Sequence, residues 1–303
     1  MFVVETLAYA DSEENGKVLV TVVMPIYNAG AYLRLAVLSI VEQSFVHWEL
    51  LIIDDGSTDD ALDSIADIED IRIQILRDGK NLGLAARLNQ ACEMARGRYI
   101  ARMDQDDVSY PERLMTQFEV LENNPDIDVL ATRAVFIDER NCLAGVFPYA
   151  GKHGEISARP WFGFYFPHPT WMSKTTWLRR FRYAVPAPFL SEDYELLLRS
   201  YQYSQFKTVD TILLAYRKRA HVNHWKVAKT RAAVLRSQLH FFSKQKKLRY
   251  AALSLIAFCI KKLGDLFRCF GFLKTAAPAP ATVADKWADT LAKLLAKGDV
   301  KSV

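Results

Sequence analysis

Short apolar runs alternate with amphipathic segments through the first third of the chain. Apolar runs of strand length occupy residues 18–24, 48–54, 71–76 and 98–103. Between them, residues 29–44, 58–68 and 82–97 carry apolar side chains at helical spacing, and a fourth such segment begins at Pro111. Short strands joined by helices are typical of a parallel sheet. The pattern therefore predicts an α/β fold, in which Gly97 ends the third helix.

Polar residues gather where each of these four strands ends. The segments are PIYNAG, DDGSTDD, RDGKNLG and DQDD, which begin at residues 25, 54, 77 and 104. In parallel sheets, ligands collect outside the carboxyl ends of the strands. Packing alone also ends strands in polar turns, and DDGSTDD by itself suits a bend at Gly56 with Ser57 or Thr58 capping a helix. Four polar ends in series favour one shared site.

Three carboxylates, Asp104, Asp106 and Asp107, crowd the end of the fourth strand. A partly buried cluster of negative charges needs a compensating positive charge. Asp-x-Asp at a strand end suits Mg²⁺ or Mn²⁺, because one or two carboxylates leave coordination positions open for substrate phosphates. The alternative is structural, with Asp107 or Ser109 capping the helix that follows.

Charge divides the chain into two parts. Half of the 303 residues are hydrophobic, which is enough for a substantial core, and the net charge is +4. Residues 1–216 contain 20 Lys and Arg against 31 Asp and Glu, whereas the remainder contains 19 against 4. An acidic body needs local cations to hold polyphosphate, and a basic tail suits anionic lipid. Few aromatic residues interrupt the basic part, so we expect no nucleic-acid partner.

Cysteine usage and the absence of a leader pattern indicate a cytosolic setting. The four cysteines form no CxxC pair, so neither a disulfide framework nor a zinc site is predicted. Residues 1–16 lack the basic start and continuous apolar core of a secretory signal. The longest uncharged apolar run, residues 250–260, is too short to span a bilayer.

Residues 20–59 (VTVVMPIYNAG to DDGSTD) followed by residues 81–107 (NLGLAARLNQ to RMDQDD) resemble the inverting nucleotide-sugar glycosyltransferases of family 2. The motifs occur in the family's order and at its approximate spacing, over about residues 18–220. The resemblance implies a GT-A fold, a Rossmann-like and mostly parallel sheet flanked by helices. It also implies Mn²⁺ or Mg²⁺ as cofactor, a nucleotide-sugar donor with UDP-sugar favoured, and a saccharide or lipid-linked acceptor in surface polysaccharide synthesis.

The resemblance assigns most of the polar strand ends to the donor. Asp55 is implied to lie near the base, Asp104 near the ribose or diphosphate, and Asp106 on the metal, with His221 as a further metal contact. The implied nucleotide-sugar-binding residues are Pro25, Tyr27, Asn28, Asp55, Asn81, Gly83, Arg87, Asp104 and Gln105. Three of these residues have a simpler explanation when taken alone. Tyr27 could be a core-packing residue, Asn28 a turn residue and Arg87 a solvent-exposed helix residue.

The second half carries the implied catalytic and acceptor residues. FLSEDYELLLRS, residues 189–200, resembles the family's Glu-Asp motif, which implies Asp193 as general base and Glu192 as a residue that fixes its geometry. The alternative is a helix start enriched in acids for its dipole. The aromatic segment 160–183 implies acceptor binding by Trp161, His168 and Trp171, and core packing under a loop is the alternative.

The predicted organisation has four parts. These are an N-terminal segment 1–17; a GT-A domain 18–223 with a nucleotide-binding half 18–108 and an acceptor half 109–223; a basic amphipathic helical extension 224–273; and a Pro/Ala linker with a short C-terminal helix in 274–303. The basic extension predicts association with an anionic membrane surface, on the inner face of the cell membrane. Its alternative is packing on the domain with the charged face in water.

Three other functions fit parts of the sequence. MDQDDV matches the nucleophile motif of haloacid-dehalogenase-type phosphotransferases, with Asp104 as nucleophile, although three strand-helix units precede it here. A dinucleotide enzyme would share the parallel sheet, but the first strand lacks GxGxxG. A nucleotide-sugar-binding protein without turnover is the third, and the presence of both Asp106 and Asp193 favours an enzyme instead.

Overall fold

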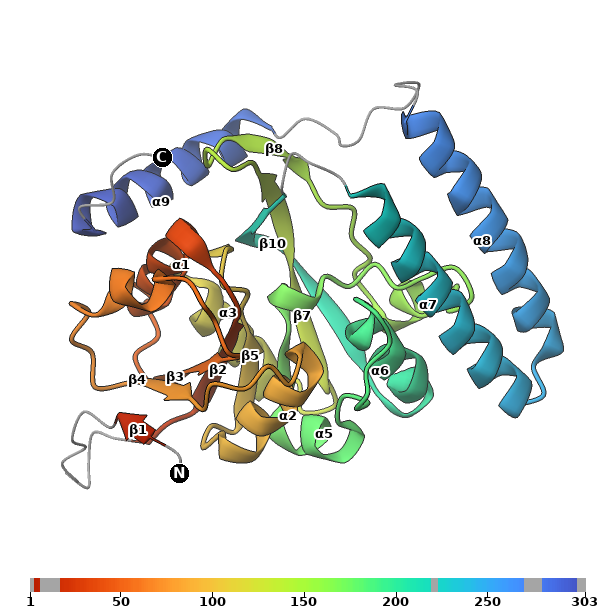
Figure 1. The fold of residues 1–303 in the computed structure, drawn as a ribbon, viewed down its shortest axis with the longest axis horizontal. Coiled ribbons are helices and arrows are strands. Elements are labelled where there is room, and N and C mark those ends of the chain that lie inside the picture. Colours follow the sequence, from red (N-terminus) through yellow and green to blue (C-terminus); the bar gives the residue numbers. More distant parts are fainter. Residues whose placement is uncertain (1–2, 6–16, 219–222, 270–279, 299–303) are drawn as a thin grey trace.

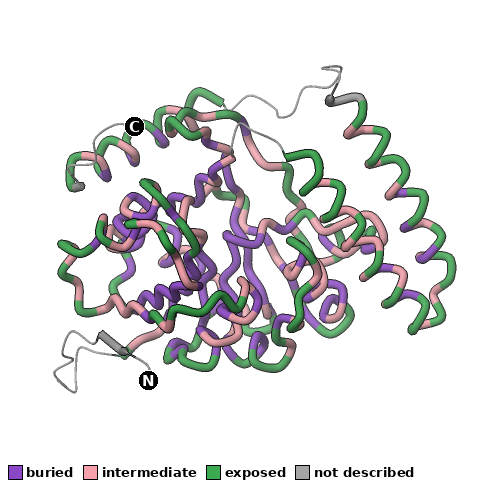
Figure 2. Tube along the Cα trace, in the orientation of Figure 1, coloured by how far each residue is buried: buried purple, intermediate pink, exposed green. Residues whose placement is uncertain are grey.

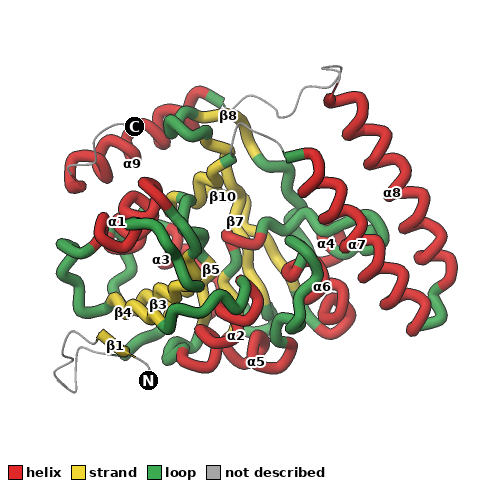
Figure 3. Tube along the Cα trace, in the orientation of Figure 1, coloured by secondary structure: helices red, strands yellow, loops and turns green. Residues whose placement is uncertain are grey.

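One large sheet with helices on both faces forms the centre of the protein (Figures 1 and 3). A computed structural model describes residues 3–5, 17–218, 223–269 and 280–298. The strands are β1 (Val3–Glu5), β2 (Val20–Ile26), β3 (Trp48–Asp54), β4 (Ile73–Arg77), β5 (Tyr99–Arg102), β6 (Val108–Ser109), β7 (Val129–Ile137), β8 (Leu143–Val146), β9 (Met172–Lys174) and β10 (Phe206–Arg217). Their order is β1-β4-β3-β2-β5-β9-β7-β10-β6, with β8 paired to β7.

The helices alternate with the strands in the first half and cluster toward the end of the chain. They are α1 (Leu33–Val41), α2 (Leu84–Met94), α3 (Arg113–Asn123), α4 (His153–Ile156), α5 (Thr175–Phe181), α6 (Glu192–Ser200), α7 (His224–Lys244), α8 (Leu248–Cys269) and α9 (Ala281–Gly298). Short 3₁₀ helices occupy Gly30–Tyr32, Ala61–Ile65, His168–Thr170 and Tyr201–Tyr203.

The parallel sheet predicted for the first half is confirmed. β2 pairs in parallel with β3 and β5, and β3 pairs in parallel with β4. β9 runs antiparallel between β5 and β7, and β7 pairs in parallel with β10. β2 and β3 are buried along their whole length, as expected for central strands covered on both faces. The carboxyl ends of β2, β3, β4 and β5 therefore lie along one edge.

Core side chains fill both faces of the sheet, and Figure 2 shows the buried residues along the central strands. Successive residues of β2 point to opposite faces, so Val22 packs with α1 and α3 while Val23 packs with α2, α5 and α6. This double cover explains why the strands are continuous apolar runs without alternation.

Two sequence predictions about this region are wrong. Residues 58–68 form only the short 3₁₀ helix Ala61–Ile65, and the hydroxyls of Ser57 and Thr58, which were expected to cap a helix, bond to Asn28 instead. The helix that was predicted to end at Gly97 is α2, and it ends at Met94, three residues earlier. A Cβ atom on Gly97 would lie 2.5 Å from the backbone nitrogen of Thr21, so close backbone approach explains this glycine.

The basic extension is a helical hairpin. α7 packs against α6 and α8, and the Phe242 side chain of α7 is fully buried in the core. Gln238 of α7 donates to the Trp161 carbonyl at 2.8 Å and to the Tyr194 hydroxyl at 2.6 Å. The first helix of the extension thus packs on the α/β domain, while the outer side of α8 faces solvent (Figure 2).

The last helix, α9, crosses back over the first half of the sheet and packs on α1 (Figure 1). Trp287 is buried there beside Tyr110, and its Nε1 donates to the Asn141 carbonyl at 2.8 Å. Lys297 forms an ion pair with Glu42 at 2.6 Å. The apolar face of α9 is therefore covered by the protein's own core. None of the described helices combines the length and hydrophobicity that crossing a bilayer requires.

Candidate active site

Side-chain hydrogen bonds join the four polar strand ends, as predicted. Gln105, after β5, accepts from the Tyr27 backbone N–H at 2.7 Å and donates to the Tyr27 carbonyl at 3.1 Å. Asn28, after β2, accepts through Oδ1 from the Thr58 N–H at 2.8 Å, and its own N–H donates to Ser57 Oγ at 3.0 Å. The Tyr27 side chain is 48% exposed, so the core-packing reading of this residue is wrong.

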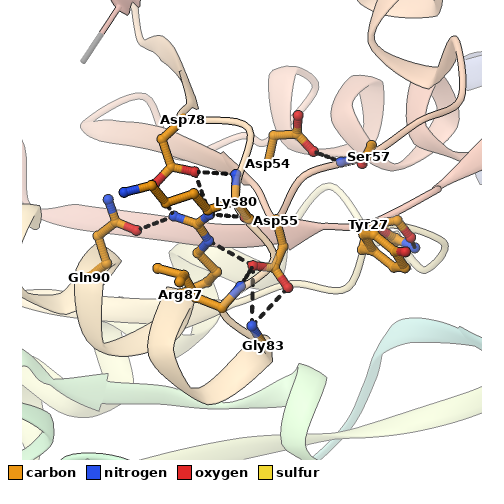
Figure 4. A network of polar contacts seen from close by, with 11 residues as sticks. Tyr27, Asp54, Asp55, Ser57, Asp78, Lys80, Gly83, Arg87 and Gln90 are labelled. Atoms are coloured by element: carbon orange, nitrogen blue, oxygen red, sulfur yellow. Dashed lines mark hydrogen bonds and ion pairs between the residues drawn. The ribbon is translucent and has the colours of Figure 1, made fainter. Parts of the chain in front are cut away.

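Asp55 links the ends of β3 and β4 through a network shown in Figure 4. Its carboxylate accepts from the backbone N–H groups of Leu82 at 2.7 Å and Gly83 at 3.0 Å, and from Arg87 Nε at 2.8 Å. Gly56, at φ +77°, makes the bend that aims Asp55 toward this loop, as expected. Asp55 therefore fixes the loop at residues 82–83, and Asn81 beside it is exposed.

Arg87 lies at the centre of the same network, and the expectation that it is a solvent-exposed helix residue is wrong. The side chain is 1% exposed. Nη2 forms an ion pair with Asp78 at 2.6 Å and also donates to the Lys80 carbonyl, while Nη1 donates to Gln90 Oε1 at 2.8 Å. The Arg87 guanidinium lowers the pKa of the Asp78 carboxyl to about 2. Arg87 thus holds the loop after β4 in place.

The DQDD segment after β5 lies against two arginines that sequence reasoning did not assign. Arg102 is buried on β5 and donates to the Asp104 carboxylate and to the Met103 carbonyl. Arg113 is fully buried behind it and donates to the Arg102 carbonyl at 2.7 Å. Burial lowers the pKa of the Arg113 guanidinium to about 9. Part of the positive charge that the three carboxylates need is therefore supplied by the protein itself.

Asp107 is buried and takes no part in capping α3. Its Oδ1 accepts from the Arg217 N–H at 2.9 Å, whereas the residue at the start of α3, Glu112, makes no side-chain cap. Burial, followed by the charges of Asp104 and Asp106, raises the pKa of Asp107 well above its usual range. Arg217 Nε also donates to the Asp106 carbonyl at 2.8 Å. Asp107 therefore ties the DQDD segment to β10, and the cap reading is wrong.

The Glu-Asp pair stands at the first turn of α6. Asp193 Oδ1 accepts from the Tyr194 N–H at 2.7 Å. Burial raises the pKa of Asp193, and the charge of Asp104 raises it further while Arg102 lowers it. Burial and the charge of Asp193 raise the pKa of Glu192 to about 7. Arg102 and Asp104, at the end of β5, therefore act electrostatically on the candidate base, which lies 89 positions after Asp104 in the sequence.

The three residues assigned to the acceptor are mostly packed. Trp171 is 3% exposed and packs against Phe166 and His168, as the core alternative describes. His168 is buried, and its Nε2 lies 2.7 Å from the Tyr183 hydroxyl. Burial, followed by the charge of Arg102, lowers the pKa of His168 well below its usual range, which keeps the ring neutral. Trp161 is half-buried, and its carbonyl accepts from α7.

The residues that could hold a metal are the carboxylates of DQDD. Within the described part of the chain, no three His, Cys, Asp or Glu side chains cluster as a ready-made metal site. His221 lies outside the described residues. Half-buried Asp106 beside Asp104 offers the hard oxygen donors that Mg²⁺ and Mn²⁺ prefer, and such ions are usually held by one or two carboxylates together with substrate phosphates and water. The donor chemistry therefore fits a divalent ion that arrives with its substrate.

A mostly parallel sheet with carboxylates at the carboxyl ends of its strands is the arrangement of GT-A-type glycosyltransferases. Residues 21–180 match the family model described as glycosyl transferase family 2. The chain belongs to glycosyltransferase family 2 and is an enzyme of that class, which sets aside the phosphotransferase, the dinucleotide enzyme and the binding protein without turnover.

Relatives and a solved structure agree with this assignment. The uncharacterized glycosyltransferase MJ1057 of Methanocaldococcus jannaschii is 34% identical over 210 residues, which cover 67% of this chain and 72% of the relative. The Escherichia coli protein WfgD, a UDP-Glc:α-D-GlcNAc-diphosphoundecaprenol β-1,3-glucosyltransferase, is 34% identical over 106 residues, 35% of this chain and 42% of WfgD. The mannosyltransferase PcManGT of Pyrobaculum calidifontis, solved with GDP-Man and Mn²⁺, superposes with a TM-score of 0.57 at 17% identity, covering 94% of this chain and 88% of that one. The last likeness confirms the GT-A fold.

Proposed function

We propose that the protein is a metal-dependent inverting glycosyltransferase. It moves a sugar from a nucleotide diphosphate sugar, with UDP-sugar favoured, to a hydroxyl of a saccharide or lipid-linked acceptor in surface polysaccharide synthesis. The observation that carries this proposal is the hydrogen-bonded edge of the sheet, where Gln105 of DQDD bonds to the backbone of Tyr27 after β2. The carboxyls of Glu192 and Asp193, whose pKa values are raised by burial, supply the candidate base for an acceptor hydroxyl.

The donor end is built by the first half of the sheet. The exposed Tyr27 side chain offers a ring face to a nucleobase. The loop at residues 78–83, held by Asp55 and Arg87, forms a further part of this end (Figure 4). Asp106 and Asp104 would hold Mn²⁺ or Mg²⁺, which neutralises charge on a departing diphosphate when bound. Arg102 keeps Asp104 in place from the strand side.

The acceptor end is built around α6. In the proposed reaction, Asp193 accepts the proton of the acceptor hydroxyl while that oxygen forms a bond to the anomeric carbon. The bond between the anomeric carbon and the diphosphate oxygen breaks, the nucleoside diphosphate leaves, and the anomeric configuration inverts. Glu192 holds the neighbouring position, and the charge of Asp193 contributes to its raised pKa.

Two relatives support the substrate classes. WfgD is named for a UDP-sugar donor and a diphosphoundecaprenol-linked acceptor, and PcManGT was solved with a nucleotide sugar and Mn²⁺. The outer face of α8 supports a place at the membrane. Leu255, Ile256, Ile260, Leu263 and Leu266 are all exposed there. We therefore propose that the enzyme is cytoplasmic and lies on the anionic inner face of the cell membrane.

A thermal-shift screen of nucleotide sugars with Mn²⁺ tests the donor part. UDP-sugars are expected to raise the melting temperature, and Asp106→Asn is expected to abolish the metal-dependent part of that shift. The exposed Asp126 provides a matched control, since Asp126→Asn removes a carboxylate far from the site and should leave the shift unchanged. The donor proposal fails if no nucleotide sugar or nucleoside diphosphate shifts the wild-type protein in the presence of Mn²⁺.

A transfer assay tests the base. Asp193→Asn should keep the donor-induced thermal shift and lose transfer by at least about 100-fold, the scale of general-base catalysis. A fully active Asp193→Asn variant would overturn the assignment of the base while leaving the donor site intact.

A further inference from the structure

A groove with a volume of about 960 Å³ lies between α6, α7 and the loop that leads into α6. One wall is the loop at residues 186–189, and a second is the α6 face that carries Glu195, Leu198 and Arg199. The third wall is α7, from Lys229 to Gln245. The donor site described above contributes none of these residues.

The groove has two kinds of lining. Pro186, Pro188, Leu198 and Phe241 give it an apolar side. The side formed by α7 carries cations, spaced so that they share one helical face: Lys229, Arg236 and Lys244. An apolar surface combined with a row of cations fits a ligand that has both an anionic group and a hydrocarbon chain.

The cations of the groove have few competing charges. Glu195 is the one carboxylate among the lining residues, and it pairs with Arg199 at 2.5 Å. Among the residues that the structure describes, no carboxylate forms an ion pair with Lys229, Arg236 or Lys244. A ligand that brings an anionic group would therefore meet charges that the protein leaves uncompensated.

The groove lies next to the candidate base along α6. Glu192, Glu195 and Arg199 lie at positions i, i+3 and i+7 of α6, so they share one face of the helix. The groove wall at Glu195 is therefore about one turn, roughly 5 Å, from the Glu192–Asp193 pair. A group bound in the groove can carry an attached sugar to Asp193.

The mouth of the groove is unusually apolar for an exposed surface. Trp225 is 62% exposed at the start of α7, and Phe189 lies beside it with ring centroids 6.4 Å apart. Lys229 Nζ lies 4.0 Å from the centre of the Trp225 ring. Exposed Trp next to Lys is typical of protein surfaces at the boundary between lipid and water.

We infer that this groove binds the diphosphate and the adjoining isoprenoid units of a lipid-linked acceptor, with Arg236 and Lys244 on the diphosphate. This inference rests on the proposed function, because it names where the acceptor of that reaction lies. A soluble saccharide would leave the row of cations without a partner, and inorganic phosphate would leave the apolar side uncovered. A prenyl diphosphate satisfies both requirements, because it joins an anionic group to a hydrocarbon chain.

Calorimetric titration with farnesyl diphosphate, a short prenyl diphosphate, tests the inference on the full-length protein. Farnesyl diphosphate should bind at least about tenfold more tightly than inorganic pyrophosphate or farnesol. Pyrophosphate lacks the hydrocarbon chain, and farnesol lacks the anionic group. Arg236→Gln combined with Lys244→Gln should weaken farnesyl diphosphate by at least about tenfold, the scale of one charge-assisted hydrogen bond. Lys293→Gln, on the exposed face of α9, is the matched control and should change nothing.

Two outcomes would overturn the inference. Equal affinity for farnesyl diphosphate and for a short-chain phosphatidylglycerol would assign the groove to bulk lipid, and unchanged affinity in the double variant would remove the cations from the site. The donor thermal shift, measured on the same variants, reports folding and the donor site separately. If the donor binds and farnesyl diphosphate does not, the groove assignment fails alone; if only farnesyl diphosphate binds, the glycosyl-transfer proposal fails instead.

Discussion

Arg87 Nε donates a 2.8 Å hydrogen bond to Asp55 Oδ1, across 32 positions of sequence and between α2 and the end of β3. The other side of the same guanidinium pairs with Asp78, after β4, at 2.6 Å. One buried cation thus joins two strand ends and the loop between β4 and α2 (Figure 4). This edge of the sheet is held by the Arg87 guanidinium as well as by backbone pairing.

Replacing Arg87 should cost much of the domain's stability. Arg87→Met leaves the Asp55 and Asp78 carboxylates without their cation, and breaking a buried ion pair from one side costs about 3–5 kcal/mol in the free energy of unfolding. Urea denaturation measures the loss. Arg98→Met is the control, because Arg98 pairs with Glu122 on the surface and should change the stability by less than about 1 kcal/mol. Equal losses of unfolding free energy in the two variants would show that the buried Arg87 network stabilises the protein no more than a surface ion pair does.

Gly97 should not tolerate a methyl group. In Gly97→Ala the new Cβ would lie 2.5 Å from the Thr21 nitrogen and 2.8 Å from the Val20 carbonyl carbon, both backbone atoms that cannot move aside cheaply. We expect a loss of about 1–3 kcal/mol or more in the free energy of unfolding, the cost of overpacking a core. Gly154→Ala in α4 is the matched control, since a Cβ there meets nothing within 4 Å and should leave stability unchanged or raise it slightly. A stable Gly97→Ala protein would contradict the close packing of β2 against this turn.

The sequence predicted those elements that are determined locally. β3 coincides with the predicted run 48–54, because a fully buried central strand is a continuous apolar segment bounded by polar turns. β9 was not predicted, since its pairing with β5 and β7 is set by distant parts of the chain. The predicted helix at 58–68 is only a short 3₁₀ helix, and the groups expected to cap it bond to the distant Asn28 instead.

In the candidate site, too, local patterns were visible in the sequence, whereas contacts between distant residues were not. DQDD was singled out as a crowd of carboxylates at a strand end, and the Glu-Asp pair by its resemblance to the family motif; the roles of both stay predictions. Arg102 was missed, because a single basic residue in a strand gives no sign of its partners until the fold shows it beside Asp104. The burial of Trp171 was equally hidden, since an aromatic residue suits a sugar-binding surface and a core alike.

Membrane association should depend on the outer face of α8. Ile256 and Ile260 are 55% and 59% exposed and lie one turn apart. Ile256→Asp combined with Ile260→Asp should lower the fraction that sediments with phosphatidylglycerol vesicles at least about tenfold, because it replaces apolar surface that would enter the lipid with charge of the wrong sign. Ala292→Asp on the exposed face of α9 is the control and should sediment like the wild type. Undiminished sedimentation of the double variant would exclude α8 as the membrane-binding face.

Transfer activity should fall on the acid side of neutrality because of the Glu192–Asp193 pair. Burial, followed by the charge of Asp193, raises the pKa of Glu192 to about 7, and burial also raises the pKa of Asp193. A general base acts only when it is ionised, so kcat/KM should climb by up to about tenfold per pH unit and level off above about pH 7. The two carboxyls titrate as a coupled pair, so the midpoint belongs to both.

Stability should run in the opposite direction over the same range. A carboxyl whose pKa is raised by folding favours the native state while protonated; this contribution is complete below the unfolded pKa of about 4.3 and is lost as pH rises through about 7. Glu192→Gln removes the charge next to Asp193, so the acid limb of kcat/KM should move to lower pH and the loss of stability between pH 4.3 and 7 should become smaller. Glu119→Gln, on the exposed face of α3, is the matched control and should leave both profiles in place. If the acid limb stays near pH 7 in Glu192→Gln, Asp193 alone determines the profile and Glu192 has no part in setting it.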